Sequence, residues 1–178
     1  MSASGDVPPE TRFVATLQVV WREGGHLAYS WRRLFAAPID AAWVSALANE
    51  PEAAERMEAF VSRFGRMQDT IADRLLPRWL QALAEQPGSL IETLNRAERL
   101  GVLANAAHWL EARKLRNRLV HEYMEDPEDF AAGLNAASRY SMMLMDTYNQ
   151  VRDFALRRMR LADAALPAAL ELPGPRPE

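Results

Sequence analysis

The chain has 178 residues, the length of one domain, and 49% of them are hydrophobic, which is enough for a core and excludes wholesale disorder. The formal net charge of −3 excludes nucleic-acid binding by bulk positive charge, so any such contact must come from a local patch. There is no cysteine, which removes disulfides, thiolate chemistry and cysteine-bound zinc. No signal peptide and no run of about 18 apolar residues is recognisable, so we expect a cytoplasmic protein without membrane contact.

The first part of the chain predicts a tail and two helices. Residues 1–10 are small and polar and include prolines, as in a flexible tail. A helix is expected from Arg12 to about Phe35, because apolar residues recur there with helical spacing. The "AAPID" segment breaks that helix, and Asp40 is placed to cap a short helix around Trp43.

The middle of the chain contains strong start and stop signals. A long helix follows Pro51, and Pro77 is expected to bend or end it. Ser89 and Glu92 have the spacing of a capping box, and the helix that they start should stop at Gly101. Asn105 is placed to cap the next helix.

The last long helix is expected to begin at Asp126-Pro127, which combines a cap with proline at the first helical position, and to run to about Arg160. No segment alternates with period two and no hairpin signal appears. The sequence therefore predicts an all-α fold, an antiparallel up-and-down helical bundle with short connections.

The segment "RNRLVHEY", residues 116–123, departs from ordinary amphipathic helix. On a helical wheel at about 100° per residue, Arg116 falls in the middle of the apolar arc. Arg113 and Asn117 also lie within that arc, and His121 lies at its border, one turn after Asn117. A guanidinium on an apolar face needs a partner, a water-filled cleft or another chain.

Two interpretations of this polar group remain open. In the first, Arg116 is structural and pairs with an acid on a neighbouring helix. In the second, the group is a functional site. For either, Gln68 and Asp69 are the supporting candidates to meet Arg113 or Arg116, because Gln68 falls on the apolar stripe of its helix and Asp69 flanks it. The histidines outside this segment are single and far apart, so we expect no metal ion and no cofactor.

The spacing of Arg116, His121 and Tyr123, with Asn117 directly after the arginine, is an R-x4-H-x-Y motif. It resembles the signature of HEPN-domain proteins, and specifically of HepT-like toxins, which pair with a minimal nucleotidyltransferase antitoxin. The preceding "NRAERLGVLANAAHWLEARKL" also looks like the sequence that leads into the motif in such proteins.

The resemblance spans roughly residues 55 to 155. It divides the chain into a flexible N-terminal tail (1–10), an N-terminal helical extension that the family does not match (11–50), a HEPN-like helical bundle (51–163) and a Pro-rich C-terminal tail (164–178). In the family, two copies dimerise with their motif helices facing each other.

The resemblance also implies an activity, which is metal-independent cleavage of RNA. Arg116 would hold phosphate, His121 would transfer protons or contact phosphate, and Asn117 would fix the geometry. The antitoxin would add AMP to Tyr123. Independently of the family, cleavage by the ribose 2′-OH needs a group near pKa 6.5 and a cation for the developing phosphorane charge, which suits His and Arg.

Three functions are therefore compatible with the sequence. The first is the ribonuclease toxin of a toxin–antitoxin pair, a homodimer that acts on RNA and is neutralised by a nucleotidyltransferase. The second is a non-catalytic HEPN module that binds a nucleotidyltransferase or a nucleotide. The third is a helical adaptor in which Arg116 is only structural.

Overall fold

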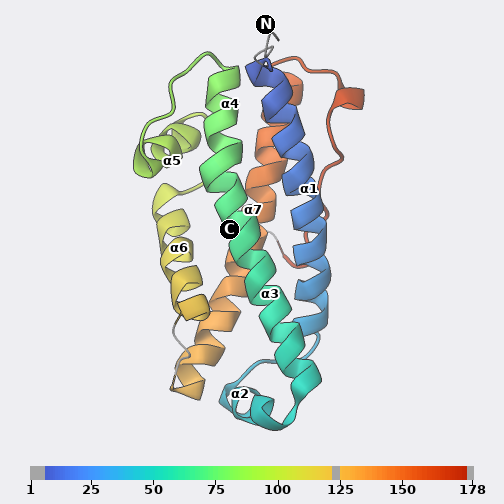
Figure 1. Cartoon of the computed structure of the whole chain (residues 1–178), viewed down its shortest axis with the longest axis vertical. Helices are drawn as coiled ribbons and strands as arrows, with labels where there is room; N and C mark the ends of the chain where they lie inside the picture. The colour runs from blue at the N-terminus through green and yellow to red at the C-terminus, as the bar shows by residue number, and fades with distance from the viewer. Residues whose placement is uncertain (1–6, 122–124, 176–178) are drawn as a thin grey trace, which may run out of the picture.

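The computed structural model describes residues 7–121 and 125–175, which form helices and connecting segments without a β-strand; of His121 it describes the backbone. The long helical segments run alternately down and up in Figure 1: α1 (Pro9–Leu34), α3 (Pro51–Thr70) continuing into α4 (Leu76–Ala82), α6 (Ala106–His121) and α7 (Pro127–Arg157). Shorter elements join or flank them: α2 (Ala41–Ala46), η1 (Leu47–Asn49), η2 (Ile71–Leu75), α5 (Leu90–Arg99) and η3 (Asp163–Ala165).

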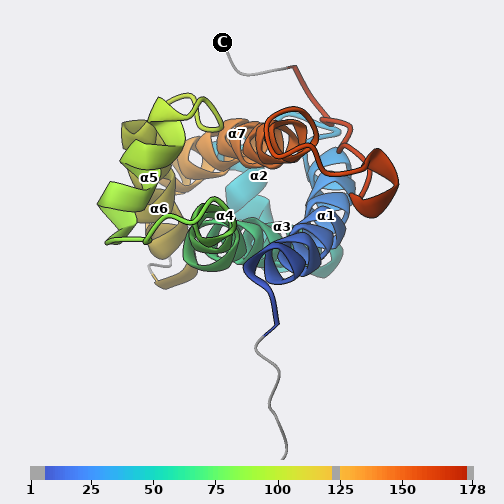
Figure 2. The same cartoon turned by 90° about the horizontal axis from the view of Figure 1, so that it is seen from above.

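The expected all-α antiparallel bundle is confirmed. Seen from above, α7 lies opposite α3 and α4, with α1 on one side and the α5–α6 pair on the other (Figure 2). The core lies between these helices. No helix in the described ranges combines the length and the apolar character that crossing a bilayer requires.

The helix starts follow the capping signals in the sequence. Asp40, Asn105 and Asp126 each accept a hydrogen bond from a backbone N–H in the first turn of the following helix. The capping box is complete, because the Ser89 and Glu92 side chains each accept the other residue's backbone N–H. Such bonds satisfy the N–H groups that a helix start leaves unpaired.

The helix that begins at Pro51 does not end at Pro77. It continues through η2, a π-helical turn in which the Leu76 N–H donates to the Ile71 carbonyl, five residues back. Proline lacks an N–H group, and its ring would collide with the carbonyl four residues before it in a regular α-helix. The wider π-turn accommodates that collision without breaking the helix, and such turns are frequent at functional sites.

The segment expected as an N-terminal extension belongs to the same core as the rest of the bundle. Phe13, Leu17, Val20 and Leu27 of α1 have zero exposure and join one hydrophobic cluster with residues of α3 and α7. Because α1 packs most extensively against α3 and α4, it forms one layer of the bundle.

Within the expected C-terminal tail, residues 164–175 lie along α1 and α7 and are here called the C-terminal strap. Asn149 of α7 holds its backbone twice: Nδ2 donates to the Leu170 carbonyl at 3.0 Å and Oδ1 accepts from the Leu170 N–H at 2.8 Å. The Tyr148 hydroxyl donates to the Ala168 carbonyl at 2.8 Å. The side chain of Leu170 occupies the space where Gly24 lacks a Cβ atom, so that glycine permits a close approach.

Candidate functional site

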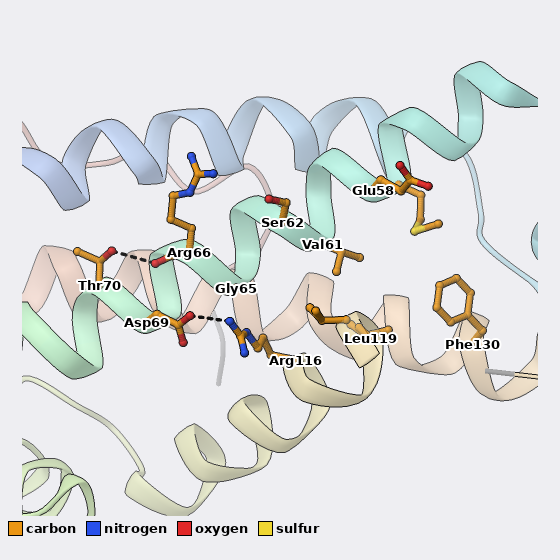
Figure 3. Close-up of a pocket in the computed structure, with 12 residues that line it drawn as sticks. Glu58, Val61, Ser62, Gly65, Arg66, Asp69, Thr70, Arg116, Leu119 and Phe130 are labelled. Atoms are coloured by element: carbon orange, nitrogen blue, oxygen red, sulfur yellow. Dashed lines mark hydrogen bonds and ion pairs between the residues drawn. The ribbon is translucent and has the colours of Figure 1, made fainter. Parts of the chain in front are cut away.

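A groove of about 580 Å³ lies between α3 and α6 and reaches the start of α7 (Figure 3). Its polar lining comes mostly from α3: Glu58, Ser62, Arg66, Asp69 and Thr70. Its apolar lining comes from three helices: Met57, Val61, Leu119, Val120 and Phe130. Arg116 and Gly65 complete it, and the volume is in the range of small-molecule sites.

Arg116 reaches from α6 across this groove to α3. Its Nη2 donates to Asp69 Oδ2 at 2.7 Å, and its Nη1 donates to the Oδ1 of Asn117 at 3.0 Å. A guanidinium has five N–H donors, so three remain. Nε is buried and has no hydrogen-bond partner among the described residues. One donor on each terminal nitrogen is left for an anion, and the side chain is 26% exposed.

Gly65 makes room for this arginine. A Cβ atom at position 65 would lie 3.1 Å from Arg116 Nε and 3.3 Å from its Cγ, closer than ordinary van der Waals contact. Glycine inside a helix costs about 0.5–1 kcal/mol relative to alanine. The glycine therefore has a specific reason to be there, which is the passage of the Arg116 stem over α3.

A second ion pair joins α6 to η2, the π-helical turn that continues α3, one turn further along. Arg113 Nη1 lies 3.6 Å from Asp73 Oδ1, and Asp73 belongs to the π-turn η2. Both side chains are about a third exposed or more, so this pair contributes at most about 1 kcal/mol. Arg113 does not line the groove, and its contact joins α6 to η2.

Gln68 is not a partner of either arginine. Its side chain is fully buried, and neither Oε1 nor Nε2 has a hydrogen-bond partner among the described residues. The reason is helical geometry: one residue before Asp69, it points about 100° further round α3, into the core. Of the two candidates, Asp69 pairs with Arg116, and Gln68 is a buried amide with no hydrogen-bond partner in the part of the chain that the structure describes.

The motif is described as far as its backbone at His121, where α6 ends. Asn117 is exposed and accepts the hydrogen bond from Arg116. The His121 side chain and the whole of Tyr123 lie outside the described residues. The structure thus brings together Arg116, Asn117 and Asp69.

The other end of the groove is apolar and uncovered. Val120 is 46% exposed. Met57, Val61, Leu119 and Phe130 are buried beside it, each 7–8% exposed. Glu58 stands at this end, away from Arg116 (Figure 3).

Thr70, which also lines the groove, connects α3 to Glu23 of α1. The Thr70 Oγ1 lies 3.0 Å from Glu23 Oε1 and 3.0 Å from the Arg66 carbonyl oxygen. One hydroxyl proton serves only one of these acceptors, and a protonated Glu23 would supply the other bond. In agreement, burial raises the pKa of Glu23, against the opposing effects of the Thr70 bond and of Arg66.

Sequence reasoning missed Gly65, Ser62 and Glu58. The one signal for them was a glycine inside a strong helix, which usually has a packing or functional reason. Within the described ranges, no group of three or more His, Asp and Glu side chains is arranged to hold a metal ion.

Comparison of the chain with protein-family models, with curated proteins and with solved structures gives no match. A function for this groove therefore rests on its own residues and geometry.

Proposed function

We propose that this chain is a metal-independent endoribonuclease, the HEPN-type toxin of a toxin–antitoxin pair. The observation that supports this most is that Arg116 is held in place and still has unused hydrogen-bond donors. Asp69 and Asn117 hold its guanidinium at the edge of an open groove, and one N–H on each terminal nitrogen remains for a phosphate. An arginine fork is well suited to phosphate because two parallel donors match two phosphate oxygens.

The chemistry needs one proton-transfer group and one cation. His121 would take the proton of a ribose 2′-OH, and the 2′-oxygen would attack the adjacent phosphorus. The bond to the 5′-oxygen breaks, and that oxygen leaves with a proton returned by a histidine. Arg116 would stabilise the negative charge that develops on the phosphorane. Water is not consumed in this step, and the products are a 2′,3′-cyclic phosphate and a 5′-hydroxyl.

The proposal includes a homodimer. One α6 helix supplies one Arg116 and one His121, whereas the reaction uses a base, an acid and a cation. Two motif helices facing each other across a wet cleft would provide two of each. Sedimentation should show a dimer at micromolar concentration, and a monomer there would reject the composite site.

Neutralisation would come from a nucleotidyltransferase partner. That enzyme would transfer AMP from ATP to the Tyr123 hydroxyl and release pyrophosphate. The added phosphate would bring negative charge and bulk next to the site that RNA phosphate must occupy. Co-expression with a nucleotidyltransferase encoded next to this chain should yield protein that carries AMP and is inactive on RNA, and Tyr123→Phe should escape the adduct. Neutralisation without any adduct in the intact mass would show that control is by binding.

The central experiment is RNA cleavage by the purified chain in a buffer with a metal chelator. Arg116→Ala and His121→Ala should each lose about 100-fold or more of the activity, while the helical circular dichroism is kept. Lys114→Ala, an equal charge change on the exposed face of the same helix, is the matched control and should stay active. Full activity of either motif variant would reject the role of that residue.

A second candidate is a non-catalytic helical module, and the ion pair itself favours it. An arginine that serves only structure would also pair with an acid on a neighbouring helix, as Arg116 does with Asp69 at 2.7 Å. In that case the wild type has no nuclease activity, and replacing this partly buried pair by Met and Leu should leave stability unchanged or higher.

A further inference from the structure

We infer that the groove between α3 and α6 is a nucleotide subsite that holds a base beside the phosphate at Arg116 and selects guanine through Glu58. The inference rests on the proposed function, because it names the nucleotide that this site would take. Three features support it: the division of the groove into a cationic and an apolar end, the spacing of residues along α3, and the hydrogen-bonding capacity of a carboxylate.

The two ends of the groove match the two ends of a nucleotide. At one end, Arg116 has unused N–H donors for a phosphate. At the other end, Val120 exposes 46% of its surface beside the nearly buried Leu119 and Phe130. A base placed there would cover apolar surface that water now covers, and bases of single-stranded RNA are commonly bound against such surfaces.

The spacing along α3 puts these ends at a suitable separation. Glu58, Ser62, Gly65 and Asp69 recur every three or four residues, so they share one face of α3, and that face lines the groove. The Arg116 stem crosses α3 at Gly65 and its guanidinium is bound by Asp69, so its donors lie seven to eleven residues after Glu58, which corresponds to about 10–16 Å along the helix. The reach of a nucleotide from its phosphate to its Watson–Crick edge matches the lower end of this range.

Glu58 supplies the selectivity. An ionised carboxylate only accepts hydrogen bonds, so it favours a partner with two adjacent donors. Guanine offers N1–H and the N2 amino group side by side. Adenine and cytosine offer one amino group next to an acceptor nitrogen, and uracil offers one N–H between two carbonyl oxygens. Glu58 is exposed in the absence of ligand, so it can meet a base without first breaking a buried bond.

The test measures nucleotide binding separately from cleavage. The full chain is titrated with 5′-GMP, AMP, CMP and UMP by calorimetry, and it is also given short RNAs that differ only in having one G or one A. The variants are Glu58→Gln and, as the matched control, Glu55→Gln, which removes an exposed glutamate of the same helix outside the groove. We expect GMP to bind about tenfold more tightly than the other nucleotides, a difference that Glu58→Gln abolishes and Glu55→Gln keeps.

The outcomes separate this inference from the proposed function. Guanine-selective binding without RNA cleavage would support the subsite and reject the ribonuclease. Cleavage without a base preference, or a preference that survives Glu58→Gln, would overturn the subsite and leave the ribonuclease in place. Val120→Asp tests the apolar end directly and should weaken GMP binding; unchanged GMP binding, whether or not a dimer dissociates, would show that the base does not lie against Val120 and that the inference is wrong.

Discussion

The stem of Arg116 crosses α3 at Gly65, where an added Cβ atom would lie 3.1 Å from Arg116 Nε. The same arginine is held one turn further on by Asp69, at 2.7 Å. A glycine that costs helix stability and an acid that supplies charge therefore position one guanidinium together. Gly65 therefore lowers the stability of α3 and at the same time provides the space that Arg116 needs, so substitutions at position 65 should change stability and RNA cleavage in opposite directions.

Gly65→Ala should reduce RNA cleavage while it stabilises the helix. The new methyl group would push Arg116 aside by a few tenths of an ångström, and misplacement by about 1 Å can cost about 100-fold in rate, so we expect a loss of about tenfold. Alanine should add up to about 1 kcal/mol of helix stability, less the strain of that displacement. Cleavage rates and thermal unfolding check the two effects.

Gly25→Ala is the matched control for this prediction. It lies within α1, and a Cβ atom there would meet no atom within 4 Å. The variant should gain helix stability and keep full cleavage. Equal cleavage by Gly65→Ala and Gly25→Ala would show that Arg116 does not depend on the glycine beneath it.

Asp69→Asn should strengthen RNA binding and slow the chemical step. The Asp69 carboxylate competes with the RNA phosphate for Arg116 and also repels that phosphate, so removing the negative charge should lower KM. The Arg116 guanidinium would then be held less firmly, which should lower kcat. Asp73→Asn is the control, because Asp73 pairs with Arg113 at 3.6 Å and does not line the groove. Initial rates over a range of RNA concentrations separate the two constants, and an unchanged KM would argue against competition at Arg116.

Gln68→Met should stabilise the protein. The Gln68 amide is fully buried without a hydrogen-bond partner among the described residues, and such a group costs about 1–3 kcal/mol, which methionine of similar size avoids. Denaturant unfolding measures the gain, and Gln81→Met on the exposed side of α4 should give none. A destabilised Gln68→Met would indicate that the amide has a bound partner in solution.

Glu23→Gln should remove a pH dependence of stability. Burial raises the pKa of Glu23 above its ordinary 4.5, so the folded state binds this proton more tightly than the unfolded state does. Its contribution to stability is therefore fully present below pH 4.5 and is lost as the pH rises through the folded-state pKa. An amide mimics the neutral acid, so the variant should gain Tm at pH 7 and little at pH 4.

The control for Glu23→Gln is chosen from the charges around Glu23. Arg66 and Arg74 favour its ionised form, and Asp69 opposes it. Glu55→Gln removes the same charge from the exposed surface and should not reproduce the pH-dependent gain. If Glu23→Gln lowers Tm at pH 7, then the ionised carboxylate is the stabilising form.

Local features of the fold could be read from the sequence. The caps at Asp40, Ser89, Asn105 and Asp126 are satisfied within a few residues along the chain, so residue type and spacing are sufficient to predict them. The same holds for the apolar stripes that specify an all-α bundle, because helical periodicity is a property of each segment alone.

Two features of the fold could not be predicted from local sequence rules and are seen only in the tertiary structure. Pro77 predicts a bend or an end by its chemistry, yet a π-turn packed into the core carries the helix through it. The C-terminal strap has no periodicity to predict it, and it is held by side chains of α7 that satisfy its backbone. The bonds that hold the strap join residues about 20 positions apart in the chain, which periodicity does not encode.

In the candidate site too, some features could be predicted from the sequence and others are seen only in the tertiary structure. The sequence by itself determined that Arg116, Asn117 and His121 share one helix and that Arg116 needs compensation on an apolar arc. Only the tertiary structure decided that Asp69 and not Gln68 provides it, that Gly65 is the surface beneath the arginine, and that a groove remains open beside them. The physical reason is that neighbouring positions on a helix differ by about 100° in direction, so the packing angle between α3 and α6 selects which side chain meets Arg116.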